Sequence, residues 1–228
     1  MIYAIIFLII LIIGIFLANI SIKLLINYYN KYNSHKAHIN ITSAQLLSYF
    51  IKSFNMDILI AEYSTFLDNS YNIKRKIIFL SKDVINNTSV PALAISMHEL
   101  GHAIQHKNKS KLFYLYYTFS ILNKITSSLI IPLFVFLVVS LFLSQIYLNI
   151  ALILIVCFYL VNLIIRIIII PLERNASNIA LDLLKQYKIF DSDELQIAKK
   201  LLNLAALTYV GGFFSNYIKM FKKIFKNF

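Results

Sequence analysis

The 228-residue chain has few cysteines and few acidic residues, and each shortage argues against a class of structure or function. It has one cysteine, Cys157, so no disulfide can form within the chain. A single cysteine does not indicate whether the protein lies in an oxidising or a reducing compartment. Ten residues are acidic, against 22 lysines and arginines, and no acid lies between Glu99 and Glu173. The apolar stretches therefore lack the paired acids and bases that mark ion pathways, which argues against a transporter or channel.

Apolar residues dominate instead. They make up 59% of the chain, and the mean hydropathy of +0.72 lies outside the range of soluble proteins. The net charge of +12 could indicate nucleic-acid binding, but no basic motif of a nucleic-acid-binding module is present. Cytoplasmic loops of membrane proteins carry such a basic excess. We therefore expect a mostly α-helical integral membrane protein that contacts the lipid bilayer and no nucleic acid.

Three apolar segments are expected in the membrane. Residues 1–22 predict an N-terminal transmembrane helix; a cleaved signal peptide is the alternative, but no basic residue precedes the apolar run. Residues 112–170 contain a tyrosine-rich interfacial segment and then enough apolar residues for a transmembrane helical hairpin, with its turn near Ser144–Asn149. Residues 204–228 predict an apolar helix with a basic tail, at the lower limit of length for a span, which could cross the membrane as a fourth span, re-enter it or lie against the other helices.

The two remaining regions, residues 23–111 and 171–203, are polar and are expected on one side of the membrane. Eleven basic residues lie between Lys23 and Lys111 and nine between Arg174 and Lys226, while residues 1–22 have none. The positive-inside rule predicts a multi-pass protein of the cell membrane with both polar regions in the cytoplasm. Because the hairpin returns the chain to the side it left, the two polar regions can meet.

Local patterns within residues 23–111 predict a small α+β domain. Thr42–Gln45 matches a capping box before an apolar run, which predicts a helix of about 12 residues. Short β-branched runs at Met56–Ala61 and Lys76–Leu80, with turn residues Asp68–Ser70 between them, predict a small sheet. Its strands could serve packing alone, or an edge strand could hold an extended peptide by backbone hydrogen bonds.

The most informative motif is H-E-x-x-H, which begins at His98. Thr88–Ser89 and Pro91 predict the start of a helix around it. Positions four apart share a helix face, so His98 and His102 can offer two imidazoles to one zinc ion, with Glu99 beside the metal-bound water. The pattern also occurs by chance, and a catalytic zinc typically needs a third protein ligand.

Glu173 is the preferred third ligand. It is the first carboxylate after the motif, the hairpin returns it to the correct side, and small residues follow it at helical spacing. An acid that satisfies the helix macrodipole is the alternative, since Glu173 follows a proline at an expected helix start. His106 lies about 12 Å along the helix from His98, too far to share an ion. His35 and His38 are expected to be exposed linker residues.

Together these motifs resemble those of the bacterial membrane-bound neutral zinc metallopeptidases of the YugP-like family. The matching stretches are the N-terminal apolar segment, Thr42–Gln45, Leu80–Ser81, Ser96–Gln105, Pro171–Ser177 and Ala205–Val210. The zinc helix is shared with many peptidases, but its combination with P-x-E-x-x-A-S and A-A-L-T-Y-V is more specific. The resemblance implies a zincin-like domain at the membrane surface, with Zn2+ held by His98, His102 and Glu173, and Glu99 as catalytic base.

The chain departs from similar peptidases at two places. Other membrane zinc peptidases carry E-x-x-A-D where this chain has Ser177, so a carboxylate that would orient a histidine ligand is missing. A D-H-Y-D-P-like turn of the family is replaced by Asn69–Ile73, and any role of that turn cannot be transferred.

The leading hypothesis is a membrane-embedded zinc endopeptidase of the gluzincin type that cleaves peptides or proteins at the membrane. Zinc would lower the pKa of its water towards about 7, and Glu99 would take the proton and deliver it to the leaving amine. Tyr71, Arg174 and Tyr209 are candidates for a further oxyanion donor. The alternative is a non-catalytic membrane scaffold in which the same residues hold a structural zinc ion or none.

Overall fold

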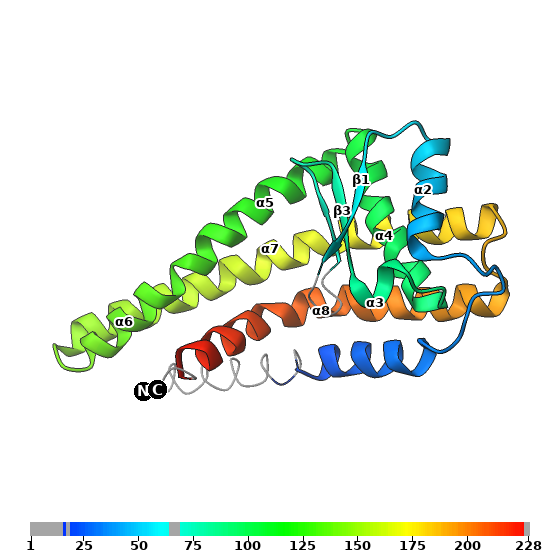
Figure 1. Cartoon of the computed structure of the whole chain (residues 1–228). Helices are drawn as coiled ribbons and strands as arrows, with labels where there is room; N and C mark the ends of the chain where they lie inside the picture. Colours follow the sequence, from blue (N-terminus) through cyan, green and yellow to red (C-terminus); the bar gives the residue numbers. More distant parts are fainter. Residues whose placement is uncertain (1–15, 17–18, 64–68, 226–228) are drawn as a thin grey trace. The chain divides into compact units, whose positions relative to one another are not determined.

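The computed structural model describes residues 16, 19–63 and 69–225, and most of the expected transmembrane helix over residues 1–22 lies outside them. Residues 19–32 are helical. The later elements (Figure 1) are α2 (Ser43–Ser53), β1 (Leu59–Tyr63), β2 (Ser70–Asn72), β3 (Ile77–Ser81), α3 (Lys82–Ile85), α4 (Val90–Lys107), α5 (Lys111–Ser128), α6 (Ile130–Ser140), α7 (Gln145–Gln186) and α8 (Ser192–Phe225). The predicted mostly α-helical class with a small sheet is confirmed.

The chain divides into two compact units. The first comprises residues 1–21, 115–170 and 208–228, and the second comprises residues 22–114 and 171–207. In the first unit, a turn at residues 141–144 separates α6 from α7, a few residues before the predicted break. Within the described part of the chain, α7 is the one helix long and apolar enough to cross a membrane, judged by length and composition.

Helix α7 joins two helices that the sequence predicted as separate, the second half of the hairpin and a helix starting at Pro171. The predicted start at Pro171 is wrong, because α7 continues through this proline to Gln186. Proline lacks a backbone N–H, so one hydrogen bond, to the carbonyl four residues earlier, is lost without ending the helix. Glu173 therefore lies inside a long helix, and satisfaction of a helix N-terminus does not explain this buried acid.

The sheet of the second unit has the strand order β1-β3-β2. β1 is parallel to β3, and β2 is antiparallel to β3, with Tyr71 opposite Ile78. The sequence predicted strands near β1 and β3 but placed Ser70 in a turn. β2 was missed because it has three residues, and serine and asparagine are turn formers. Ile78 and Leu80 are buried on one face of the sheet.

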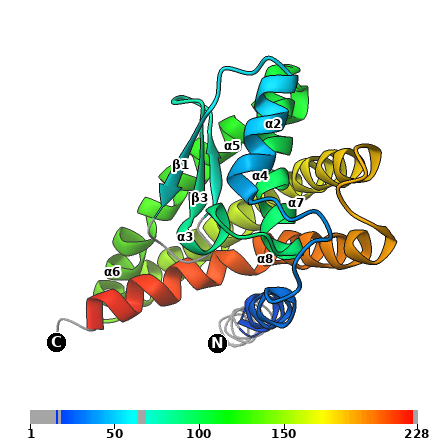
Figure 2. The same ribbon diagram turned by 45° about the vertical axis from the view of Figure 1, so that its right-hand side comes forward.

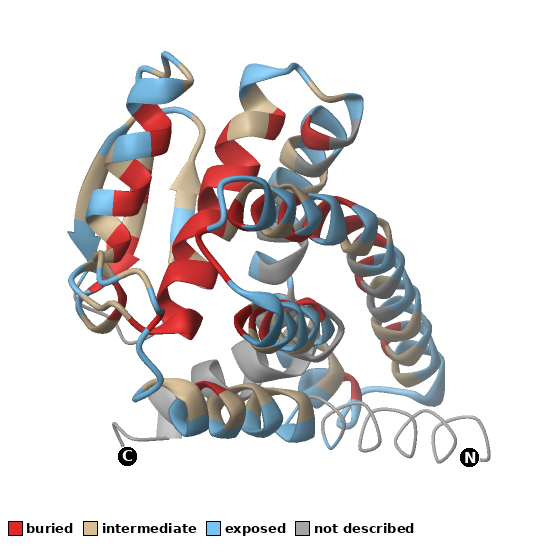
Figure 3. Ribbon diagram, turned by 90° about the vertical axis from the view of Figure 1, so that its right-hand side faces the viewer, coloured by how far each residue is buried: buried red, intermediate tan, exposed pale blue. Residues whose placement is uncertain are grey.

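Helix α4 is the centre of this second unit. Ser89 caps its N-terminus by accepting a hydrogen bond from Ala92 N at 3.3 Å, and Pro91 lies in the first turn, as predicted. Leu93 and Met97 are fully buried. The helix contacts α2, α3, β2 and β3, and Figure 2 shows α2 and the sheet beside it. Figure 3 shows the buried residues gathered on such packed helix faces.

The predicted capping box starts α2. Thr42 accepts a hydrogen bond from Gln45 N at 3.3 Å, and the Gln45 side chain accepts one from Thr42 N at 2.9 Å. Leu47 and Phe50 of this helix are fully buried in the core that includes the apolar side of α4. The packing of α2 thus fixes one side of α4 and leaves the other for polar side chains.

Candidate metal centre

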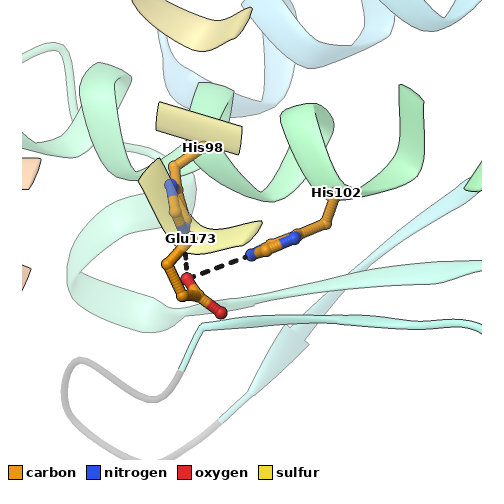
Figure 4. A group of neighbouring side chains, drawn as sticks. All are labelled: His98, His102 and Glu173. Atoms are coloured by element: carbon orange, nitrogen blue, oxygen red, sulfur yellow. Dashed lines mark hydrogen bonds and ion pairs between the residues drawn. The ribbon is translucent and has the colours of Figure 1, made fainter. Parts of the chain in front are cut away.

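Helix α4 places His98 and His102 one turn apart, with ring centroids 4.7 Å from each other. Glu173 of α7 reaches both of them. Its Oε2 lies 3.2 Å from His98 Nε2 and 3.4 Å from His102 Nε2 (Figure 4). One donor atom from each of the three residues lies within 4.8 Å of the others, so together they could hold a metal ion.

The distances among these atoms fit a small tetrahedral cation. Ligands held about 2.1 Å from zinc lie about 3.4 Å from one another, which is close to the 3.2 Å and 3.4 Å found here. Oε1 of Glu173 is buried without a hydrogen-bond partner among the described residues, although buried polar atoms usually have one. Two imidazoles and a carboxylate with one unpaired oxygen suit a zinc site with an open fourth position.

Two neutral side chains orient the histidines. Ser177 Oγ lies 3.1 Å from His98 Nδ1, and Gln105 Oε1 lies 3.0 Å from His102 Nδ1. Both contacts involve Nδ1 and leave Nε2 directed at Glu173. The resemblance to other membrane zinc peptidases implied a missing carboxylate at residue 177, and the structure shows a hydroxyl and an amide in the orienting positions.

Gln105 also determines which nitrogen of His102 carries the proton. The amide nitrogen of Gln105 donates to the Leu172 carbonyl at 3.0 Å and to Asn175 Oδ1 at 2.8 Å. Since a carbonyl can only accept, the amide oxygen must face His102. His102 therefore donates from Nδ1 and keeps the Nε2 lone pair for a metal. Sequence reasoning missed Gln105, and its place three residues after His102 was the available signal.

The charges of the cluster are strongly coupled. Burial would lower the pKa of His102, but hydrogen bonding and charge interaction with Glu173 raise it to about 9. Burial would raise the pKa of Glu173, but hydrogen bonds from His102 and His98 lower it to about 2. The buried carboxylate is thus stabilised by positive charge on the histidine side, and a divalent cation held by all three residues supplies charge of the same sign.

Glu99 lies beside this cluster and is 7% exposed. Burial raises its pKa, His98 and His102 oppose that rise, and Glu173 adds to it. A hydrogen bond from the backbone of Tyr71 in β2 also lowers the pKa of Glu99. A carboxylate whose pKa is moved towards neutrality is suited to accept a proton and return it.

The other residues named from the sequence lie elsewhere. His106 Nδ1 is 2.8 Å from the Tyr71 hydroxyl, and the structure places it outside the cluster, as expected. Tyr71 is therefore next to Glu99 through its backbone but directs its hydroxyl away, to His106. Arg174 is exposed on α7, and the side chain of Tyr209 lies outside the described part of the structure.

His38 is not an unattached linker residue, although it is 47% exposed. Its Nδ1 lies 2.7 Å from Glu194 Oε2, and with Asp191 these residues form a second group of possible metal ligands. Glu194 also accepts hydrogen bonds from the backbone amides of His38 and Asp191. These contacts explain the buried Glu194 as a cap at the start of α8 that ties down the preceding loop.

At this site an H-E-x-x-H helix meets a glutamate from a second helix, and two imidazoles with one carboxylate are a donor set found in catalytic zinc sites. Sequence comparison agrees, because the chain matches the family described as "putative neutral zinc metallopeptidase" over residues 3–227 and belongs to that family. The resemblance inferred from the motifs is confirmed.

One curated relative has a name that refers to a membrane. The chain is 26% identical over 144 residues to the "Putative membrane protease YugP" of Bacillus subtilis (strain 168). The alignment covers 63% of this chain and 61% of the relative, so the chain spans less than two thirds of that protein's length. No solved structure matches the chain.

Proposed function

We propose that the protein is a membrane-embedded, zinc-dependent endopeptidase that cleaves membrane or membrane-proximal proteins. The convergence of His98, His102 and Glu173 next to the buried Glu99 carries this proposal. Membership of a zinc metallopeptidase family supports zinc as the metal. A structural zinc site usually has four protein ligands, whereas three His and Glu residues converge here among the described residues, which favours catalysis over the scaffold alternative.

The chain's residues divide the chemistry between them. His98, His102 and Glu173 hold zinc, which when bound supplies Lewis acidity to a water molecule and to the scissile carbonyl. Glu99 accepts the proton of the attacking water and returns it to the leaving amine. The burial that raises the pKa of Glu99 makes it a stronger base than an exposed carboxylate. The same burial keeps bulk water away from the proton transfer.

The free edge of β2 supports an extended peptide as substrate. β2 is an edge strand of the described sheet, paired with β3 alone, and it also contacts α4, so it lies next to the helix that carries the metal ligands. A substrate strand that pairs with backbone groups at this edge would have its scissile bond held close to the zinc. Recognition through the backbone suits a peptidase that accepts varied sequences.

The proposal also includes a location: the protein lies in the cell membrane, with its metal centre on the cytoplasmic side. The apolar part of α7 is long enough to cross the bilayer, and Glu173 follows Ile170, the end of the predicted span, by three residues. The basic residues that flank the predicted spans favour a multi-pass topology with the metal centre in the cytoplasm, near the membrane surface. Substrates are accordingly proteins or peptides close to that surface.

The proposal is tested with detergent-purified protein and casein as substrate. Glu99→Gln removes the base while leaving the three zinc ligands in place, so we expect zinc content to be unchanged and cleavage to fall by at least 100-fold. Equal cleavage by the two proteins would rule out the mechanism. A wild-type protein that holds stoichiometric zinc but cleaves neither casein nor membrane-protein peptides would favour the scaffold.

A further inference from the structure

His106 lies on the same face of α4 as the zinc motif, yet it takes no part in the metal cluster. Its Nδ1 is 2.8 Å from the hydroxyl of Tyr71, and the two ring centroids are 5.8 Å apart. On its other side, His106 stacks on Phe113 with ring centroids 5.2 Å apart and an angle of 24°. Phe113 is 2% exposed, so the imidazole rests on a fixed support.

Tyr71 connects this imidazole to the reaction centre. It is the middle residue of β2, a strand of only three residues that pairs with β3 alone in the described sheet. Its side chain reaches His106, and β2 packs against α4 with the Tyr71 backbone close enough to Glu99 to act on that carboxyl group. Glu99 and His106 are seven positions apart, about 10 Å along α4. The two contacts therefore hold β2 against α4 at two points along the helix axis.

A three-residue edge strand has few backbone hydrogen bonds of its own, so its position depends on such side contacts. Loss of the Tyr71–His106 hydrogen bond would let β2 slide or tilt relative to α4. The Tyr71 backbone would then move away from the Glu99 carboxylate that it lies beside, although the zinc ligands on α4 and α7 would stay in place.

We infer that His106 and Tyr71 form a latch that positions β2 against the zinc helix and thereby orients Glu99 for proton transfer. Both are positioning residues, because neither reaches the metal cluster itself. The inference rests on the proposed function. It assigns a role to His106, which follows the zinc motif on α4 but does not bind zinc.

The test compares Tyr71→Phe, His106→Leu and His106→Asn with wild type, and uses Tyr63→Phe on β1, at the other edge of the sheet, as a matched hydroxyl deletion. Asn places an amide oxygen near the position of His Nδ1 and can still accept from Tyr71. The measurements are casein kcat and KM, zinc content and melting temperature. Wild-type cleavage that Glu99→Gln abolishes establishes the proposed function separately, before the latch variants are compared.

We expect kcat to fall about tenfold in Tyr71→Phe and in His106→Leu, which corresponds to the loss of one hydrogen bond. KM and zinc content should stay within about twofold, as should all parameters of Tyr63→Phe, and His106→Asn should recover most of kcat. The double variant Tyr71→Phe, His106→Leu should be no worse than either single variant. Additive losses, a rise in KM with unchanged kcat, or a loss of zinc would each overturn the latch.

Discussion

The backbone of Ala176 lies directly against Gly101, so that a Cβ atom added to Gly101 would be 2.5 Å from the carbonyl oxygen of Ala176. Gly101 stands one residue before His102 on α4, and Ala176 stands three residues after Glu173 on α7. This contact therefore sets the distance between the two helices that carry the metal ligands. The small residues predicted to follow Glu173 are buried at this crossing, with Ala176 and Ala180 fully so.

We expect Gly101→Ala to move the histidine ligands on α4 away from Glu173 on α7. The neighbour is backbone and cannot move aside like a flexible side chain, so α4 and α7 must shift, at a cost of roughly 1–3 kcal/mol in unfolding free energy. Zinc affinity, measured by competition with a fluorescent chelator, should fall by at least tenfold. Ala176→Gly in the same chain should not restore it, because the clash involves the carbonyl oxygen. Wild-type affinity in Gly101→Ala would contradict this view of the contact.

A second prediction concerns Gln105, which hydrogen-bonds both His102 and the α7 backbone at Leu172. Gln105→Leu removes the group that holds the proton of His102 on Nδ1 and leaves the Leu172 carbonyl without this donor. We expect zinc affinity to fall about 10- to 100-fold, the usual effect of losing such a partner. Gln196→Leu, the same change at an exposed position of α8, serves as control. Equal affinities in both variants would show that Gln105 does not orient the ligand.

The ion pair of the cluster predicts how the stability of chelator-treated protein depends on pH. The pKa of His102 is raised from 6.5 to about 9, so its contribution is complete below pH 6.5 and is lost as the pH rises through 9. The pKa of Glu173 is lowered from 4.5 to about 2, so its contribution is complete above pH 4.5 and is lost as the pH falls through 2.

The melting temperature of metal-free protein should therefore be highest between about pH 4.5 and 6.5 and should decline towards pH 9. His102→Gln should remove the alkaline decline. Zinc-loaded protein should behave in the opposite way, because zinc competes with protons for the histidines and binds more tightly as the pH rises. A flat melting temperature for the metal-free protein between pH 6.5 and 9 would show that His102 and Glu173 are not paired.

The proposed topology predicts which introduced cysteines can be labelled in intact cells. In a Cys157→Ala background, which removes the exposed native thiol, Lys74→Cys and Asn203→Cys should resist a membrane-impermeant thiol reagent. Gln145→Cys, at the start of α7, should be labelled. Cell lysis should expose all three positions. The reverse pattern would place the metal centre outside the cytoplasm, and protection of Asn203→Cys alone would exclude a hairpin between α4 and Glu173.

Residue spacing and chain order were enough to name the cluster. Four-residue spacing put His98 and His102 on one helix face, and Glu173 was the first carboxylate to follow Glu99 in the chain. The N-terminal caps of α2 and α4 were equally local, and they were predicted correctly. Such features depend on a few neighbouring residues and on helix geometry, which a sequence displays directly.

What the sequence did not reveal depends on contacts between distant segments. β2 has the composition of a turn and becomes a strand because β3 and α4 hold it. Pro171 suggests a helix start locally, yet α7 runs through it. Ser177 carries no motif of its own, and its role follows from His98, which it faces on α4. Gln105 is spaced to reach His102 on its own helix, but its orientation follows from its contacts with Leu172 and Asn175 on α7.

The ligands come from two helices that are 71 positions apart between His102 and Glu173. During synthesis, the nascent chain presents both histidines and Glu99 long before the third ligand exists. All of α5, α6 and the first two thirds of α7 must emerge in between. The proposed peptidase therefore cannot acquire its complete metal site, and cannot cut its neighbours, until the segment expected to enter the membrane has been made.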